Sequence, residues 1–199
     1  MNTFNFLSLN KIRQPLFVLI AIGCSLVLQS FSIEKEDTKI KSSTVTWVGS
    51  KVTGSHEGTV DLKSGSLEFD NKALTGGEFV IDMSSIICTD LSGKGKASIE
   101  RHLKSDDFFS VEEFPTANLK IVNVKKKGLD NYLVSANITI KDVTQVIEFE
   151  TTVKGETAQA KLIIDRTEFG IIYKSGNFFE ELADKAIYDE FEMTIKLKF

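Results

Sequence analysis

The chain has 199 residues, of which 42% are hydrophobic and 26% charged, an ordinary balance for a soluble globular protein. This composition excludes a disordered chain, a collagen and a protein with many membrane spans. Acidic residues number 28 against 24 Lys and Arg, and no large basic block is present, so we expect no nucleic-acid partner.

Residues 1–32 are predicted to be a secretory signal peptide. Lys11 and Arg13 precede an uncharged apolar run over residues 16–28. At about 1.5 Å per residue, this run is too short to cross the ~30 Å hydrocarbon core of a bilayer. A basic start followed by a short apolar run is typical of a signal peptide.

Cleavage is predicted close to Ser32, because Ser30 and Ser32 supply the small residues that such sites require. The expected location is therefore the periplasm or the cell exterior. Two alternatives remain open, an uncleaved N-terminal anchor and a lipoprotein attached at Cys24. Cleavage near Ser32 leaves Cys88 as the one cysteine, which predicts a chain without an internal disulfide.

From Thr44 onward, after a short N-terminal segment (33–43), apolar and polar residues mostly alternate. This is the period of a β-strand with one buried face. The run that begins at Leu119 changes phase at Val122, as at a β-bulge. Strands are predicted at residues 44–50, 57–62, 65–71, 74–83, 116–126, 131–141, 144–154 and 157–165, with 187–199 as a ninth or closing strand.

Turn residues separate these runs. Hairpin corners are predicted at Gly65, Gly76–Gly77, Gly128–Asn131 and Gly155. One stretch, Gly95–Leu103, has the spacing of a short helix instead.

Antiparallel strands in this number close into a barrel or pack as a sandwich. Closure into a barrel removes exposed strand edges. The interior of an eight-stranded barrel is either plugged by its own side chains or holds one small ligand. The alternation does not distinguish these cases, because a dry core and an apolar cavity have the same pattern.

The sequence contains few features that indicate catalysis or metal binding. It has no Gly-rich phosphate loop, no Cys-x-x-Cys and no Gly-x-Ser-x-Gly. His56 and His102 lie far apart in the chain, without the spacing of a metal site. Cys88 is expected to be a small buried residue. We therefore predict a protein that is not an enzyme, with no catalytic residues and no metal.

Two pairs of adjacent phenylalanines, Phe108–Phe109 and Phe178–Phe179, lie in otherwise charged segments. They are expected either to plug a barrel end or to line the mouth of an apolar cavity. The run Lys125–Lys127 precedes Gly128 and fits a solubilising hairpin tip or a transient contact with an anionic membrane surface.

Several blocks, in family order over residues 44–199, resemble the YceI-like, polyisoprenoid-binding family. One departure is Asp142, where that family usually has Gly in a turn. The blocks are Trp47–Lys51 with Gly54–Gly58, Gly77–Ile86, His102–Phe109 with Phe114–Ala117, Ile138–Thr144 and Asp165–Gly170.

The resemblance implies an all-β fold, an extended, eight-stranded antiparallel lipocalin-like β-barrel with one short helix. It implies an exported bacterial protein whose apolar lumen holds a long isoprenoid chain, such as a polyprenyl tail or an isoprenoid quinone. It brings neither catalytic residues nor a catalytic cofactor.

Strand parity, together with the aromatic residues of the blocks, nominates the ligand-binding residues of the lumen. His56, Asp90 and Arg166 are predicted polar contacts near its mouth. The predicted lumen residues are Trp47, Phe79, Ile81, Met83, Phe108, Phe109, Leu119, Ile121, Ile138, Phe149, Leu162, Phe169, Phe191, Met193 and Ile195.

Two functions are consistent with this sequence. The first is an exported protein that carries or stores an isoprenoid lipid, with transient membrane contact. The second is a plugged barrel that serves a partner in envelope stress or respiration and binds no lipid. The small residues Ala136, Ala158 and Ala160 favour an open cavity and therefore the first function. Monomer and homodimer both remain open.

Overall fold

The computed structural model describes residues 36–179 and 182–199. Nine strands, one α-helix and two short 3₁₀ turns make up its regular structure. The strands are β1 (Glu36–Lys39), β2 (Ser42–Lys51), β3 (Gly54–Asp70), β4 (Ala73–Cys88), β5 (Thr116–Lys126), β6 (Asn131–Ile140), β7 (Val143–Lys154), β8 (Thr157–Asp165) and β9 (Ile187–Lys198), with α1 at Gly93–Lys104, η1 at Arg166–Phe169 and η2 at Ala183–Lys185.

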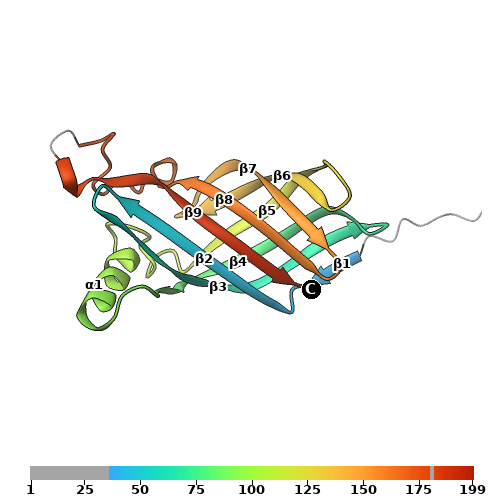
Figure 1. Ribbon diagram of the computed structural model, residues 1–199, viewed down its shortest axis with the longest axis horizontal. Coiled ribbons are helices and arrows are strands. Elements are labelled where there is room, and N and C mark those ends of the chain that lie inside the picture. The colour runs from blue at the N-terminus through green and yellow to red at the C-terminus, as the bar shows by residue number, and fades with distance from the viewer. Residues whose placement is uncertain (1–35, 180–181) are drawn as a thin grey trace, which may run out of the picture. The chain divides into compact units, whose positions relative to one another are not determined.

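The strands β2 to β9 form a closed antiparallel barrel, in which each strand pairs with the next along the chain (Figure 1). The ring closes where β2 pairs with β9, with Val45 opposite Ile195 and Trp47 opposite Met193. The predicted all-β, eight-stranded barrel with one helix is therefore confirmed. Closure leaves none of these eight strands with a fully unpaired edge.

The barrel is extended at one end by β1. The long strand β3 pairs with β2 through its first part and with β1 through its last part, where Glu36 lies opposite Phe69. Regular structure therefore begins inside the segment predicted to precede the barrel. The predicted signal peptide, its cleavage site and Cys24 lie outside the described residues.

Two predicted hairpin corners are wrong, because β3 and β4 run unbroken through Gly65 and Gly76–Gly77. Gly65 lies opposite Phe79, and a Cβ on Gly65 would lie 2.6 Å from the Cδ1 atom of that ring. The glycine makes room for an aromatic side chain and marks no turn. The chain reverses at Asn71 and Lys72, whose φ angles of 48° and 66° suit a two-residue hairpin.

The β6–β7 hairpin turns in the same way, at Lys141 and Asp142, with φ angles of 50° and 59°. Aspartate is among the non-glycine residues that adopt this left-handed region most readily. The departure from the family's glycine at Asp142 therefore leaves the turn intact. The predicted phase change in β5 is confirmed, since its register against β6 shifts between Ile121 and Asn123.

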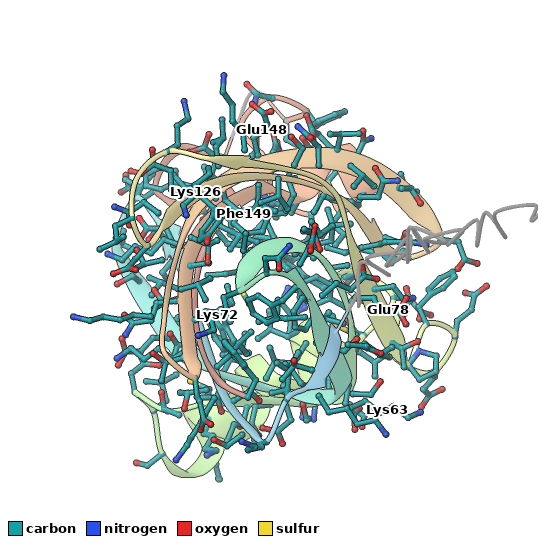
Figure 2. The ribbon with its side chains drawn as sticks, turned by 90° about the vertical axis from the view of Figure 1, so that its right-hand side faces the viewer. Lys63, Lys72, Glu78, Lys126, Glu148 and Phe149 are labelled. Atoms are coloured by element: carbon teal, nitrogen blue, oxygen red, sulfur yellow. The ribbon has the colours of Figure 1, made fainter. Side chains whose placement is uncertain are left out.

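Alternate side chains of each strand enter the barrel, as the parity predicted. Figure 2 looks at the barrel end that carries the β3–β4 turn, with Phe149 pointing inward and its neighbour Glu148 outward. In β6, Val134 and Ala136 are fully buried, whereas in β8 the outward-facing Ile163 is 63% exposed. The apolar core is thus the interior of the barrel itself.

The helix α1 lies at the opposite end (Figure 1) and is slightly longer than predicted. Glu100 Oε1 accepts a hydrogen bond from the Cys88 N–H (2.9 Å), and Lys104 Nζ donates to the Ser84 carbonyl (2.6 Å), so both bonds tie α1 to β4. The segment after α1 buries Phe108 against the barrel interior. No helix among the described residues is both long and apolar enough to cross a membrane.

Candidate binding site in the barrel lumen

The barrel interior contains two cavities, of about 130 Å³ and about 110 Å³, which we call the outer and the inner cavity. Trp47 and Phe191 are among the side chains that line the outer cavity, and Phe79 and Phe149 among those that line the inner one. Almost all of the lining is apolar. Each cavity is slightly smaller than an engineered apolar cavity of about 150 Å³ that stays dry and binds benzene.

All the predicted lumen residues except Phe169 line at least one cavity. The outer cavity alone takes Trp47, Met83, Phe108, Phe109 and Phe191; the inner cavity alone takes Phe79, Leu119, Ile121, Phe149, Leu162 and Ile195; Ile81, Ile138 and Met193 line both.

The exception, Phe169, is 1% exposed and packs in the core beside the cavities. It faces the barrel interior but lines neither cavity. It belongs to η1, which turns its side chain into the packed interior instead.

Four side chains line both cavities, namely Ile81, Ile138, Ile164 and Met193. They come from β4, β6, β8 and β9 and therefore approach the lumen from different sides. We call this set the waist. The two cavities are neighbours along one lumen and are divided there.

The inner cavity ends at a floor of aromatic side chains, Phe69, Tyr132 and Phe199, each at most 8% exposed. The rings of Phe69 and Phe199 lie 5.2 Å apart between centroids. On the far side, the same three residues line a separate surface hollow. The floor thus closes this end of the lumen. The outer cavity instead extends to Tyr188 and Glu190, which are exposed, and this end is called the mouth.

Arg166 is 2% exposed and lines the outer cavity on the side of the mouth. Its guanidinium donates hydrogen bonds to the carbonyls of Ile171 (2.6 Å), Ile187 (3.0 Å) and Tyr188 (3.2 Å), and to Asp189 Oδ1 (3.1 Å). Burial lowers the pKa of Arg166, and the nearby aspartates oppose this shift. The side chain stays cationic because an arginine pKa is so high.

The local sequence explains why Arg166 points inward. The Asp165 carboxylate accepts a hydrogen bond from the Thr167 N–H (2.8 Å) and so caps the start of η1. Gly170, with φ of 74°, ends that turn in the left-handed conformation that glycine adopts freely. The chain turns tightly between these two residues, and this turn directs the Arg166 side chain into the barrel.

His56 and Asp90 line neither cavity, and the prediction of a shared polar mouth is corrected for both. They pair with each other instead, with 2.8 Å between His56 Nδ1 and Asp90 Oδ2. Asp90 also accepts hydrogen bonds from the Cys88 thiol (3.0 Å) and the Glu57 N–H (3.1 Å). Bonds from Cys88 and His56 hold the pKa of Asp90 below its usual range. This cluster ties the β2–β3 hairpin to the end of β4.

Cys88 is completely buried, and burial raises the pKa of its thiol. A protonated, inaccessible thiol is a poor nucleophile, so its contacts with Asp90 are structural. Among the described residues, no group of three or more His, Cys, Asp or Glu side chains is arranged to hold a metal ion.

Two ring nitrogens are buried without a hydrogen-bond partner among the described residues, Nε1 of Trp47 and Nε2 of His102. Trp47 lines the outer cavity. His102 instead packs edge-on against Phe108 and Tyr173, with ring centroids 5.6 Å and 4.5 Å away. Burial lowers the pKa of His102.

The closed barrel, its apolar lumen and the capped turn at Arg166 account for the blocks that suggested a family. The profile of the YceI-like domain matches residues 31–199. The chain belongs to the YceI-like family.

Its similarity to individual YceI-like proteins is moderate. A UPF0312 protein of Yersinia enterocolitica is 26% identical over 138 residues, covering 66% of this chain and 65% of that protein. The chain spans between about a third and two thirds of the length of the curated relatives it matches, from 31% to 65%.

Among solved structures, BcnA of Burkholderia cenocepacia is 20% identical with a TM-score of 0.62, covering 78% of this chain and 94% of that one. A polyisoprenoid binding domain of Saccharophagus degradans, described as implicated in plant cell wall breakdown, is 14% identical with a TM-score of 0.56, covering 82% of this chain and 97% of that one. At these identities the two structures show a shared fold.

Sequence reasoning missed Gly49 as a lining residue of this YceI-like barrel. Gly49 lies two residues after Trp47 on the same face of β2 and lines the outer cavity. Apart from Gly49 and its two chain neighbours, no described residue has a heavy atom within 4 Å of the position that a Cβ of Gly49 would occupy. Extending the inward parity of Trp47 by one step would have found it.

The pair Phe178–Phe179 neither plugs the barrel nor lines a cavity, since the two side chains are 55% and 46% exposed. Their backbone N–H groups donate to the carbonyl of Ser175, which is itself bridged to Ile187 at the mouth. Tyr188, also exposed, follows directly after Ile187. We call the exposed Phe178, Phe179 and Tyr188 the aromatic lip.

Proposed function

We propose that this protein is an exported carrier or reservoir that holds a long isoprenoid lipid, a polyprenyl chain or an isoprenoid quinone, inside the barrel. The observation that carries the proposal is the pair of apolar cavities in line within one closed barrel. The fold shared with a polyisoprenoid binding domain supports the same ligand class. The predicted signal peptide supports export.

The energetics are adequate for such a ligand. Burying one CH₂ group contributes about 0.8 kcal/mol, so one five-carbon isoprene unit contributes roughly 3–4 kcal/mol at most. A few units therefore reach the ~8 kcal/mol of micromolar affinity after the several kcal/mol that association costs. An apolar lumen binds such a chain without any charged anchor.

The proposal puts the polar end of the lipid at the mouth. Arg166 and Glu190 line the outer cavity, whereas none of the described residues that line the inner cavity is charged. The Trp47 Nε1–H is a buried donor without a partner among the described residues, and Trp47 lines the outer cavity. The isoprenoid tail then points towards the floor.

The aromatic lip supports transient membrane contact at the same end. Phenylalanine and tyrosine side chains that are exposed around an apolar cavity are suited to the interfacial region of a bilayer. Loading at the lip would spare the lipid a passage through water.

The proposal is tested on protein purified from its own host envelope in native form. Lipid extraction followed by mass spectrometry should recover an isoprenoid at close to one molecule per chain. A protein recovered empty, which also fails to take up added quinone or polyprenol, would contradict the proposal.

One observation favours the plugged barrel as a second candidate. The two cavities are small, at about 130 and 110 Å³, so a long chain enters only if lining side chains move. The substitution Ala160→Trp separates the candidates, because Ala160 lines the inner cavity. In a lipid carrier this substitution blocks the binding of long chains. In a plugged barrel it lowers the unfolding temperature, and there is no lipid binding for it to change.

A further inference from the structure

The waist divides the lumen into two short cavities. The outer and inner cavities are each smaller than the ~150 Å³ cavity that accepts a benzene ring. Each therefore accommodates only a short stretch of an isoprenoid chain, and the outer cavity with the open mouth holds a shorter chain than both cavities together. A longer ligand reaches the inner cavity only by passing between Ile81, Ile138, Ile164 and Met193.

The four side chains differ in how easily they move. Three are isoleucines, whose β-branch restricts rotation about χ1. Ile138 and Ile164 are in addition 5% and 3% exposed and packed in the core. Met193 is unbranched, with three rotatable side-chain bonds, and adapts its shape at low cost. Its register places it between Trp47 of β2 and Leu162 of β8, so it extends from the wall of the barrel into the lumen.

We infer that Met193 determines the length of isoprenoid chain that the protein accepts. With the methionine side chain across the waist, a ligand occupies the outer cavity alone. When the side chain swings towards the wall, the chain continues into the inner cavity until it meets the floor. This inference rests on the proposed function and adds to it a specificity-determining residue.

The sequence offers a matched pair of substitutions for the test. Ile and Leu have the same atoms and nearly the same volume, but only Ile carries the β-branch that stiffens χ1. Met193→Ile therefore fixes the waist, and Met193→Leu is its control of equal size. Comparable unfolding temperatures for the two variants show that both barrels are folded.

The probes are geraniol, farnesol and geranylgeraniol, alcohols of two, three and four isoprene units with the same polar end. Trp47 is the single tryptophan of the chain and lines the outer cavity, so its fluorescence reports each binding event. For the wild type, the Kd should fall from geraniol to geranylgeraniol by at least about tenfold per added unit.

Met193→Ile should bind geraniol within about twofold of the wild type, but geranylgeraniol at least about tenfold more weakly. Met193→Leu should change the three affinities by the same factor, so that the dependence on chain length is that of the wild type. Equal affinity of the wild type and Met193→Ile for geranylgeraniol would overturn the inference, as would an equal loss for every chain length. A wild type that binds none of the alcohols would instead overturn the proposed function, and the inference with it.

Discussion

The two ends of the barrel are held together by different interactions. At the floor, Phe69, Tyr132 and Phe199 fill the interior with rings. At the mouth, Arg166 satisfies three backbone carbonyls and the Asp189 carboxylate. The packed rings stabilise the floor by filling its space. The directional hydrogen bonds of Arg166 stabilise the mouth without filling the space beside them. This difference explains how one end can stay accessible in a barrel that is stable at both.

The largest effect is expected at the mouth. Arg166→Met leaves the carboxylate of Asp189 without its cation, and Arg166 and Asp189 have side chains only 2% and 13% exposed. Breaking a buried ion pair on one side costs about 3–5 kcal/mol. Urea denaturation should show this loss, and the double variant Arg166→Met/Asp189→Leu should recover only part of it, because three backbone carbonyls still lose their donor. A single variant as stable as the wild type would show that the network does not hold the mouth together.

At the floor, Phe199→Ala should lower the free energy of unfolding by about 3 kcal/mol through the cavity that it leaves. The Phe199 side chain is 7% exposed and packs on Phe69. Phe178→Ala removes an equal ring from the mouth, where it is 55% exposed, and serves as the matched control. Similar losses in both variants would contradict the assignment of Phe199 to a packed floor.

A smaller effect depends on pH. Burial lowers the pKa of His102 from 6.5, so the unfolded chain binds this proton more readily than the folded one. Stability is then complete above pH 6.5 and declines as the pH falls below it, until the folded-state pKa is passed. His102→Phe, which keeps a ring between Phe108 and Tyr173, should flatten this part of the stability profile. If thermal melts of His102→Phe between pH 7 and pH 5 give the same profile as the wild type, a group other than His102 causes the pH dependence.

The smallest effect on stability is expected at the aromatic lip. Phe178→Ser with Phe179→Ser should change the unfolding free energy by no more than about 0.5 kcal/mol, since both side chains are exposed. Co-sedimentation with neutral phosphatidylcholine vesicles should nevertheless fall. A matched variant at the floor end, Lys126→Ser, should leave that binding unchanged. Loss of vesicle binding in Lys126→Ser alone would place membrane contact at the other end of the barrel.

Much of the barrel was predictable, because a buried face repeats every two residues whatever the ligand. Met193 and Ile195 could be assigned to the lumen by parity alone. The unbroken course of β3 could not, since Gly65 is a turn signal by composition and only its partner Phe79 shows that the glycine accommodates a ring. Likewise the pairing of His56 with Asp90 joins residues 34 positions apart, which no local pattern reports.

The division of the lumen was also beyond the sequence. Ile81, Ile138 and Ile164 read as ordinary inward residues in their own strands. That they meet at one level depends on the stagger between strands, and bulges in β3 and β5 help to set that stagger. Parity predicts which residues face inward, whereas register decides which of them touch.

The pairing of β2 with β9 has a consequence for how the molecule is made. Synthesis delivers β2 early and β9 last, and Ser42 lies opposite Lys198 in the finished sheet. Until β9 has left the ribosome, the nascent sheet has two edge strands with unpaired backbone groups, which can pair with other chains. Such a non-local seam forms slowly, so closure of the barrel is a late step of folding.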